Sequence, residues 1–359
     1  MDRVRVQPDK IREFYLFVLG QLNVPAGEIE TVADAAIFAS LRGIDSHGFI
    51  PTLTRAVKEI RAGIVKPDAR IKILKENENG ALIDANMSLG PVTGVKAMEI
   101  AIEKANKAAV ATVVAFNCNH FGTASYYATR ALDKDMIGVV FCNASPTVAP
   151  FGGREAVHGT NPMSFAIPAG KYNPLVLDIS TSVVAGGKII QALRKGEKIP
   201  EGWALDKYGN PTTDPKAALE GVRLPMGGHK GYGLGLVVDV FTAALAGSLI
   251  GKEIPPYWDL TTPYGASYFM MVINPESFAG VEKFKQKVDR LIQDCKSCAP
   301  MEGFKEVMVP GEVELTEEQK RKKEGIPVNK NQWDEMVETL RSNGIKLDSW
   351  ENTLFEEKY

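Results

Sequence analysis

A short apolar stretch that ends in a polar, glycine-containing turn constrains the fold of this chain most strongly. Residues 112–116 are small, β-branched or aromatic and lie between polar residues, which is typical of a strand buried on both faces. His120 follows at the carboxyl end of this strand, and a helix is predicted over 124–132. Ligand sites in open α/β sheets lie beyond the carboxyl ends of strands. His120 is therefore a candidate functional residue, and the alternative is a loop histidine bonded to backbone.

Further strands and helices alternate along the middle of the chain. Apolar stretches predict strands at 71–74, 81–83, 136–142, 163–167, 175–178 and 268–273, the first two as a hairpin. Helical spacing predicts helices at 90–107, 227–247 and 281–295. Residues 196–226 are rich in glycine and proline, and we expect them to form a loop or a lid. This alternation predicts an α/β core.

Helical segments are expected on both sides of this core. Apolar residues at helical spacing predict helices at 8–20, 26–42, 52–62 and 331–341, with a charged helix after Glu312. Thr316 and Gln319 have the spacing of a capping box in that charged helix. We therefore divide the chain into a helical segment (1–70), an α/β core with the cofactor and substrate site (71–304) and a helical arm (305–359).

Composition excludes several classes of protein. The net charge of −2 gives no field that would attract nucleic acid or an anionic membrane. No apolar run approaches the roughly 18 residues of a membrane span, and the charged start of the sequence lacks the apolar core of a signal peptide. Four cysteines are too few for a disulfide scaffold. We expect a cytoplasmic protein with a small-molecule substrate and neither a nucleic-acid nor a membrane partner.

All four histidines lie in glycine-flanked turns or at a predicted helix start. They are His47, His120, His158 and His229. A neighbouring glycine allows close approach of backbone or ligand, and histidine exchanges protons near neutral pH. We expect at least one of them to be catalytic, and a structural hydrogen bond is the alternative for each.

Two further segments suit a ligand that carries phosphate. Gly231, Gly233 and Gly235 follow Lys230 in a helical pattern, where each glycine costs about 1 kcal/mol relative to alanine. A helix start that binds phosphate and close helix–sheet packing explain these glycines equally well. Asp178 ends a predicted strand and could bond ribose hydroxyls.

A phosphate site at residues 178–182 has one alternative, and two standard phosphate-binding motifs are absent from the sequence. The alternative at residues 178–182 is a helix cap by Ser180 or Thr181. No complete dinucleotide fingerprint follows a strand, and no P-loop motif occurs.

The cysteines carry no evident chemistry. Cys295 and Cys298 form a lone C-x-x-C pair without the further ligands that zinc needs, so no metal site is expected. Cys118 and Cys142 are expected to be small buried hydrophobic residues. The buried setting of Cys118 argues against a cysteine–histidine hydrolase, and no nucleophile-elbow motif supports a serine hydrolase.

Six motifs, taken in order, resemble those of the type 2 malate/L-lactate dehydrogenase family over nearly the whole chain. They lie at 45–48 with 61–63, 119–122 with 126–127, 159–162, 177–182, 227–233 and 310–312. The family also contains sulfolactate, ureidoglycolate and diketogulonate dehydrogenases and cyclic imine reductases. The resemblance implies a nicotinamide-dependent oxidoreductase that works as a homodimer. It also implies a non-Rossmann α/β fold with a mixed-sheet core.

Matching motifs imply roles for individual residues. His120 corresponds to the proton acceptor of the family, and His47 to a histidine that has this role in other members. The implied cofactor contacts are Ser145, Asp178, Ile179, Ser180, Lys188, His229, Lys230, Gly311 and Glu312.

The sequence departs from the family pattern at one position that bears on substrate binding. Relatives usually carry an arginine four residues after the first histidine, but Pro51 stands there. Arg55 and Arg42 are therefore the candidate carboxylate ligands, together with Ser46.

The expected reaction is the reversible oxidation of a small 2-hydroxy acid by NAD or NADP. Malate is the first candidate substrate, and lactate and sulfolactate follow. Lys188, Arg194 and Lys195 could contact a 2′-phosphate, and solvated surface charge is the alternative. Other candidate reactions are the reduction of a cyclic imine and the oxidation of ureidoglycolate. A non-catalytic protein that binds a phosphate ligand is the alternative from another class.

Overall fold

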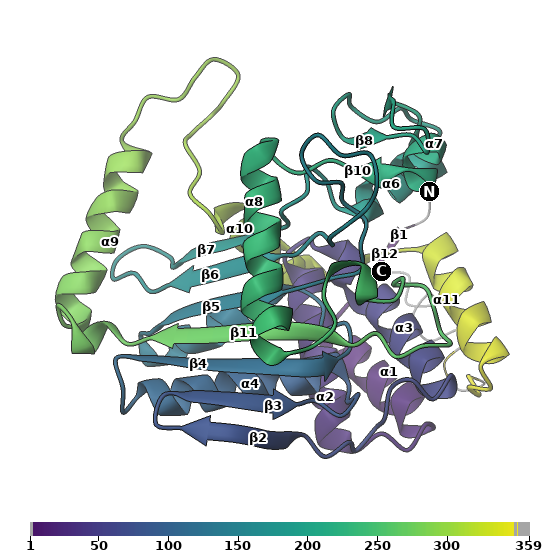
Figure 1. Ribbon diagram of the computed structural model, residues 1–359, viewed down its shortest axis with the longest axis horizontal. Helices are drawn as coiled ribbons and strands as arrows, with labels where there is room; N and C mark the ends of the chain where they lie inside the picture. The colour runs from purple at the N-terminus through teal and green to yellow at the C-terminus, as the bar shows by residue number, and fades with distance from the viewer. Residues whose placement is uncertain (1–2, 348–349, 351–359) are drawn as a thin grey trace.

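A seven-stranded mixed sheet forms the centre of the computed structural model, which describes residues 3–347 and 350. The strand order is β2-β3-β4-β11-β5-β6-β7, as Figure 1 shows. Only β3 and β4 are parallel, and every other neighbouring pair is antiparallel. The strands are β2 (Lys72–Asn77), β3 (Gly80–Asp84), β4 (Val110–Cys118), β5 (Ile137–Cys142), β6 (Met163–Ile167), β7 (Leu175–Ile179) and β11 (Ala266–Ile273). This topology confirms the α/β class and the non-Rossmann mixed sheet, because a Rossmann sheet is mostly parallel.

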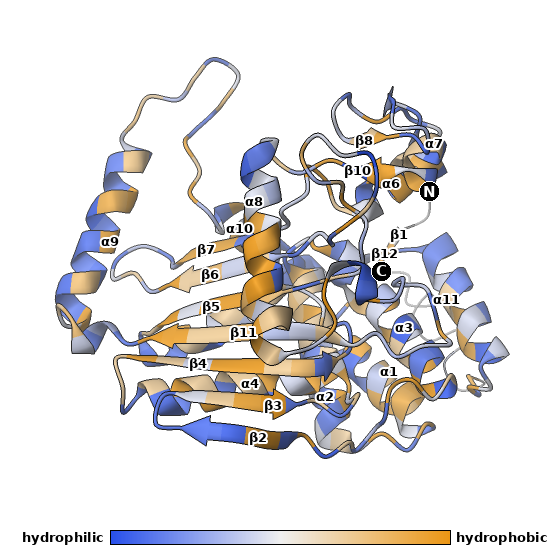
Figure 2. Ribbon diagram, in the orientation of Figure 1, coloured by the Kyte–Doolittle hydropathy of each residue, from blue (hydrophilic) through white to orange (hydrophobic). Residues whose placement is uncertain are grey.

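Helices cover both faces of the sheet. Helices α4 (Gly90–Ala105) and α5 (Ala124–Ala128) pack on one face, and α8 (His229–Asp239) crosses the other face in front of the strands (Figure 1). Central strands are apolar, whereas the edge strand β2 combines apolar and hydrophilic residues, as Figure 2 shows, and is exposed throughout. The sheet and α4 and α5 enclose the largest apolar core.

The helical segments at the two ends of the chain share a second core. Helices α1 (Pro8–Gly20), α2 (Ala26–Leu41) and α3 (Phe49–Arg61) pack with α11 (Lys330–Ser342). Strand β1 (Arg3–Val6) pairs antiparallel with β12 (Ile326–Asn329). Neither strand was predicted, because each has four residues and its partner lies at the other end of the sequence.

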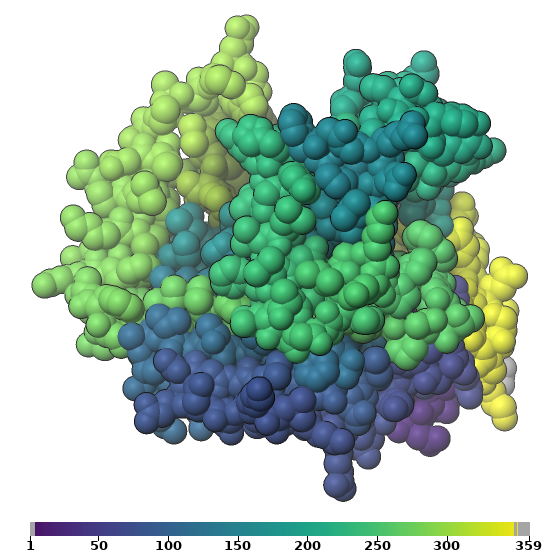
Figure 3. Space-filling view, in the orientation of Figure 1, coloured from purple at the N-terminus to yellow at the C-terminus, as the bar shows by residue number. Residues whose placement is uncertain are grey.

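The expected loop at 196–226 is wrong, because this segment contains regular structure. It holds β8 (Ala204–Leu205), β9 (Pro211–Thr212), β10 (Val222–Arg223) and α7 (Pro215–Glu220). Together with α6 (Gly186–Lys195), which the sequence did not predict, it encloses a small core of its own. Figure 3 shows this small unit, residues 183–226, as a teal lobe at one edge of the molecule. Strands of two residues are too short to give a periodic signal.

Three helix boundaries also differ from expectation. The helix predicted over 227–247 runs over 229–246, but α8 ends at Asp239 and the π-helical turn η3 (Val240–Ala244) interrupts it before two last α-helical residues. Beyond α5 the chain forms the 3-10 turn η2 (Thr129–Lys134). Helix α10 (Glu312–Glu324) begins directly after Gly311, so Thr316 lies inside it and bonds the Glu312 carbonyl. The predicted capping box is therefore wrong.

The remaining elements connect the core to the site. They are α9 (Val281–Lys296) and the 3-10 turns η1 (Asp45–His47), η4 (Gly251–Glu253) and η5 (Pro275–Ser277). Within the described residues, no helix combines the length and the apolar character that a bilayer crossing requires.

Candidate active site

The turn that carries His120 is fixed from three sides at the end of β4. The side chain of Asn119 donates a 2.9 Å hydrogen bond to the Ser88 carbonyl, and the Tyr268 hydroxyl of β11 donates to the Asn119 carbonyl. A Cβ on Gly90 would lie 2.1 Å from the His120 carbonyl oxygen, so only glycine lets α4 begin against this turn. These contacts therefore hold the backbone of His120 in place at the end of β4.

The turn η1 places His47 beside His120. The guanidinium of Arg321 on α10 donates to the Ser40 carbonyl at 2.6 Å and to Asp45 at 2.5 Å, which anchors this turn. The hydroxyl of Ser46 lies 2.9 Å from Nδ1 of His47. The rings of His47 and His120 are stacked, with 5.4 Å between their centroids.

Arg55 borders the two histidines. It lies one helical turn after Pro51 on α3, so both residues project from the same side of the helix. Its guanidinium is 3.6 Å from the centre of the Tyr257 ring and 2.5 Å from the Glu59 carboxylate. The Tyr257 ring in turn lies 5.3 Å from His120. Helical spacing therefore places Arg55 on the same side of α3 as Pro51, toward His120.

Arg42, the other candidate cation, is engaged elsewhere. Its Nε donates a 2.8 Å hydrogen bond to Glu318 of α10, and its guanidinium lies 4.0 Å from the centre of the Phe38 ring. The structure therefore brings Ser46 and Arg55 together with the histidines and uses Arg42 to hold α10 against α2.

Burial lowers the pKa of both imidazoles, and positive charge lowers that of His120 further. Burial holds the pKa of His120 well below its ordinary value, and the charges of Arg55 and His47 lower this pKa further. Burial also lowers the pKa of His47, and the nearby carboxylate of Asp178 partly opposes this effect. A neutral imidazole has one nitrogen that accepts a proton and one that donates. This pair can therefore exchange a proton with a bound hydroxyl or carbonyl group.

Asp178 has structural contacts in addition to its charge. Its Oδ2 accepts hydrogen bonds from the Thr123 hydroxyl at 2.5 Å and from the Ser125 N–H at 2.8 Å, at the start of α5. A helix cap by Ser180 or Thr181 is excluded, because the next helix, α6, begins only after Ala185.

The hydroxyls that follow Asp178 bond nearby backbone. Ser180 bonds the carbonyl of Ser182 at 3.2 Å, and Thr181 bonds that of Thr160 at 3.0 Å. Ile179 is the last residue of β7, so these residues lie at the end of an edge strand.

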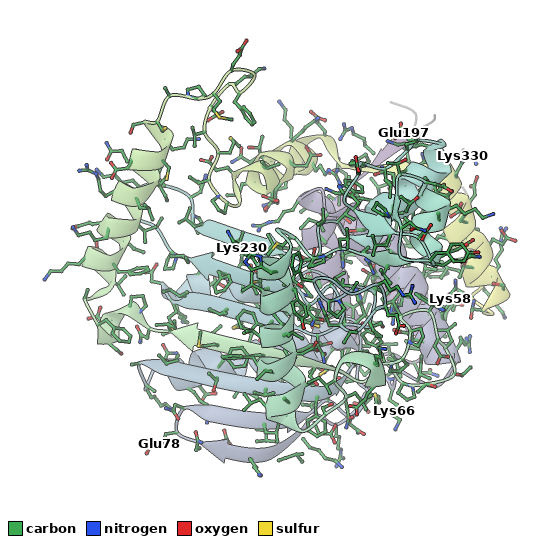
Figure 4. The ribbon with its side chains drawn as sticks, turned by 45° about the horizontal axis from the view of Figure 1, so that its top comes forward. Lys58, Lys66, Glu78, Glu197, Lys230 and Lys330 are labelled. Carbon is green, nitrogen blue, oxygen red and sulfur yellow. The ribbon has the colours of Figure 1, made fainter. Side chains whose placement is uncertain are left out.

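The start of α8 has the properties of a phosphate cradle. Gly227 and Gly228 have φ angles of 57° and 64°, and no side chain caps the helix. Lys230 is exposed there, and its side chain has no hydrogen bond or ion pair among the described residues (Figure 4). The N–H groups of Lys230 and Gly231 donate to the carbonyls of Gly227 and Met226, so the positive end of the helix dipole and the exposed lysine, rather than a row of free N–H groups, suit the phosphates of a nicotinamide cofactor.

Close packing accounts for two of the three glycines in α8. A Cβ on Gly231 would lie 2.3 Å from the Met226 carbonyl, and one on Gly235 would lie 2.7 Å from the His158 ring. Gly233 has nothing within 4 Å of its Cβ position. Packing therefore explains Gly231 and Gly235 and leaves Gly233 without a packing reason.

Other expected cofactor residues lie around β7 and the start of α10. The Val176 N–H donates to the Pro310 carbonyl at 3.1 Å, and Gly311 follows with a φ of 95°. The Glu312 carboxylate accepts hydrogen bonds from Lys296 and from the Val309 N–H, both at 2.9 Å. The Glu312 side chain thus stabilises the turn at 309–312 that leads into α10.

Ser145 lies on the side of the site that holds Arg55. Its hydroxyl donates a 2.7 Å hydrogen bond to the Pro255 carbonyl, and its N–H donates to the Tyr264 hydroxyl. Tyr264 also faces the Arg55 guanidinium, with 5.5 Å to the ring centre.

The basic residues of α6 lie on the small unit. Lys188 and Lys195 line a surface pocket of about 230 Å³ with Lys198 and Trp203. Arg194 pairs with Glu335 of α11 at 3.2 Å. His229 is exposed at the start of α8, with its ring centre 5.9 Å from that of Phe151.

Two candidates prove to be structural. His158 is fully buried beneath α8 with Nδ1 2.9 Å from the Gly159 carbonyl, so the structural alternative is correct for it. Cys118 is also fully buried, and burial raises the pKa of its thiol well above the ordinary value, which disfavours a thiolate nucleophile. The sequence did not reveal Tyr257 and Tyr264, because residues 248–265 have neither helical nor strand periodicity.

Comparison with known proteins identifies the family of this chain. The family model described as malate/L-lactate dehydrogenase matches residues 6–337. The L-sulfolactate dehydrogenase of Methanocaldococcus jannaschii is 40% identical over 96% of this chain and 99% of its own, and its structure superposes with a TM-score of 0.89. The malate dehydrogenase of Pyrococcus abyssi is 39% identical over 96% of both chains. The malate dehydrogenase of Entamoeba histolytica is 30% identical, with a TM-score of 0.91 over 96% of this chain and 99% of its own. This chain therefore belongs to the malate/L-lactate dehydrogenase family.

Proposed function

We propose that this protein interconverts a small 2-hydroxy acid and its 2-oxo acid with a nicotinamide cofactor. Malate is the first candidate substrate, with sulfolactate and lactate next. The observation that carries the proposal is the stacked, neutral pair His47 and His120 beside Arg55. Relatives named for malate and for sulfolactate support an acid with a hydroxyl beside its carboxylate.

His120 is the proposed proton acceptor in the oxidation direction. Its depressed pKa keeps the ring unprotonated at neutral pH, so a lone pair is available to the substrate hydroxyl. His47 would hydrogen-bond the same oxygen or the adjacent carboxylate from the stacked position. A bound nicotinamide supplies the acceptor for the hydride that leaves the same carbon.

Arg55 is the proposed ligand of the carboxylate next to the reacting carbon. Its Nε is buried without a hydrogen-bond partner among the described residues, so the guanidinium has a donor to offer. A bound carboxylate would offset the charge of Arg55, which is one cause of the low pKa of His120. Substrate binding would therefore raise the basicity of His120 where the proton must be accepted.

The start of α8 is the proposed phosphate site of the cofactor, with Lys230 as its cation. Both NAD and NADP are candidates. Fluorescence titration with NADH and NADPH measures the preference, and equal dissociation constants would exclude a dedicated contact to the 2′-phosphate.

A substrate panel tests the proposal. The purified protein is supplied with oxaloacetate, pyruvate, sulfopyruvate and cyclic imines, each with NADH and with NADPH, and turnover is followed at the nicotinamide absorbance. We expect reduction of at least one 2-oxo acid. Turnover of cyclic imines alone would redirect the proposal to an imine reductase. Cofactor binding without any turnover would support the non-catalytic phosphate-ligand-binding protein instead.

A further inference from the structure

Arg223 on β10 is a half-buried arginine without an acidic partner among the residues that the structure describes. Other arginines with little exposure are all paired with carboxylates. Arg42 pairs with Glu318, Arg55 with Glu59, and Arg321 with both Asp45 and Glu317. Arg223 has the same guanidinium group as these arginines and differs from them in having no carboxylate partner among the described residues.

The pKa of Arg223 reflects partial burial without a carboxylate partner. Burial lowers this pKa to about 10, and no neighbouring carboxylate raises it again. The side chain still carries a full positive charge at neutral pH. Buried charges in proteins are normally paired, because removal from water is costly without a partner. A missing partner in the folded chain points to a partner that binds from outside.

The position of Arg223 connects it to the active site. A Cβ on Gly186 would lie 2.8 Å from Nη1 of Arg223, so the guanidinium rests against the first residue of α6. A Cβ on the next residue, Gly187, would lie 3.3 Å from Cβ of Ser46. Ser46 in turn contacts His47. Gly186 and Gly187, the first two residues of α6, therefore lie between Arg223 and the turn that carries Ser46 and His47.

The backbone around Arg223 holds it firmly in this place. Its N–H donates to the Thr147 carbonyl and its carbonyl accepts from the Ala149 N–H, both at 3.1 Å. Both partners belong to the segment that follows Ser145. Arg223 is therefore a fixed cation at the boundary between the small unit and the site.

We propose that Arg223 binds the second acid group of the substrate, the one distant from the reacting carbon. This inference rests on the proposed function and extends it to substrate choice. A guanidinium binds carboxylate, sulfonate and phosphate oxygens alike. The contact between α6 and Ser46 favours the substrate as the source, and a cofactor phosphate is the competing source. A protein with this cation selects malate-like or sulfolactate-like dianions over lactate.

The test compares Arg223→Met with wild type on oxaloacetate, which has two acid groups, and on pyruvate, which has one. We expect kcat/KM for oxaloacetate to fall by about 10- to 100-fold, mostly through KM, as the loss of a charged hydrogen bond predicts. We expect less than about a threefold change for pyruvate, because a one-acid substrate makes no contact there. Arg223→Lys should restore part of the loss. Arg154→Met removes an exposed arginine outside the proposed site and should change neither reaction.

Further measurements separate the outcomes. Thermal unfolding should show that Arg223→Met folds, since methionine has no charge to desolvate. NADH titration distinguishes the two anion sources, because weaker cofactor binding with equal losses on both substrates would overturn the inference in favour of a phosphate. Equal rates of wild type and Arg223→Met on oxaloacetate would also overturn it, as would a wild-type enzyme that reduces pyruvate and not oxaloacetate. In these cases the proposed function stands. A wild-type protein that reduces no 2-oxo acid removes the proposed function and this inference together.

Discussion

The imidazole rings of His47 and His120 lie nearly parallel, at an interplanar angle of 18° and a centroid distance of 5.4 Å. One ring comes from the turn before α3 and the other from the end of β4. Each ring is largely removed from water, and the charge of a protonated His47 would disfavour protonation of His120. We therefore expect the protonation of one ring to disfavour protonation of the other.

Substitution of the two histidines separates their roles. His120→Ala should lower kcat by about 10²- to 10⁴-fold, because general-base catalysis contributes that much, while NADH affinity stays nearly constant. His47→Ala is the matched variant from the other side of the stack, and a smaller loss is expected for it. Steady-state kinetics and cofactor titration measure both. Full activity of His120→Ala would assign proton transfer to His47.

Arg55 should control the acidic side of the pH–rate profile. The lowered pKa of His120 places the acidic limb of kcat/KM for hydroxy-acid oxidation below the ordinary histidine value of 6.5. Arg55→Gln removes a positive charge beside His120, so this limb should move to higher pH, and KM should rise with the loss of the carboxylate ligand. Arg61→Gln changes an exposed arginine of the same helix and serves as the control. An unchanged limb in Arg55→Gln would show that the charge of Arg55 does not reach His120.

The same two histidines should make the fold less stable in acid. Both have a lower pKa in the folded chain than the ordinary value of 6.5, so the unfolded chain binds more protons below that pH. Their contribution is complete above about pH 6.5 and decreases as the pH falls through and below this value. Urea unfolding of wild type and of His47→Gln/His120→Gln over this range measures the effect. The double variant should show a weaker dependence on pH, and an identical dependence would contradict the assignment.

Gly90 should be essential for the position of His120. Gly90→Ala places a Cβ 2.1 Å from the His120 carbonyl oxygen, so the turn or α4 must shift, at a cost of about 1–3 kcal/mol and with a loss of activity. Gly20→Ala is the matched control, because no atom lies within 4 Å of its Cβ position at the end of α1. This control should be neutral or stabilising by up to about 1 kcal/mol. Urea unfolding and activity assays compare them, and a fully active, stable Gly90→Ala would refute the steric argument.

The exposed face of α8 should be covered by a second copy of the chain. Large apolar side chains are exposed together on α8 and η3, and an apolar patch of this kind marks an interaction surface. They are Leu234, Val237, Val240, Phe241 and Leu245. Light scattering should give a dimer for wild type and a monomer for Val237→Glu/Phe241→Glu. Leu74→Glu, on the exposed edge strand β2, should remain dimeric. A monomeric wild type would exclude the homodimer.

Local patterns alone predicted much of the fold. Strand β6 was predicted at its observed bounds, and the β2–β3 hairpin and helices α1 and α11 were predicted within a few residues. The motif around His120 and the family resemblance also came from the sequence. These features depend on neighbouring residues, whose alternation and spacing are visible in the chain itself.

Long-range contacts decided the rest. The pairing of β1 with β12, the small unit at 183–226 and the stack of His47 on His120 all join segments that are far apart in sequence. The sequence named Arg42 and Arg55 as candidate carboxylate ligands, and the fold directed Arg55 to His120 and Arg42 to Glu318. It also left Arg223 half-buried without a carboxylate partner in the described part of the chain. Residue identity thus determined which chemical groups this protein has, and tertiary packing determined which of them meet, because burial and charge pairing arise only when distant segments come together.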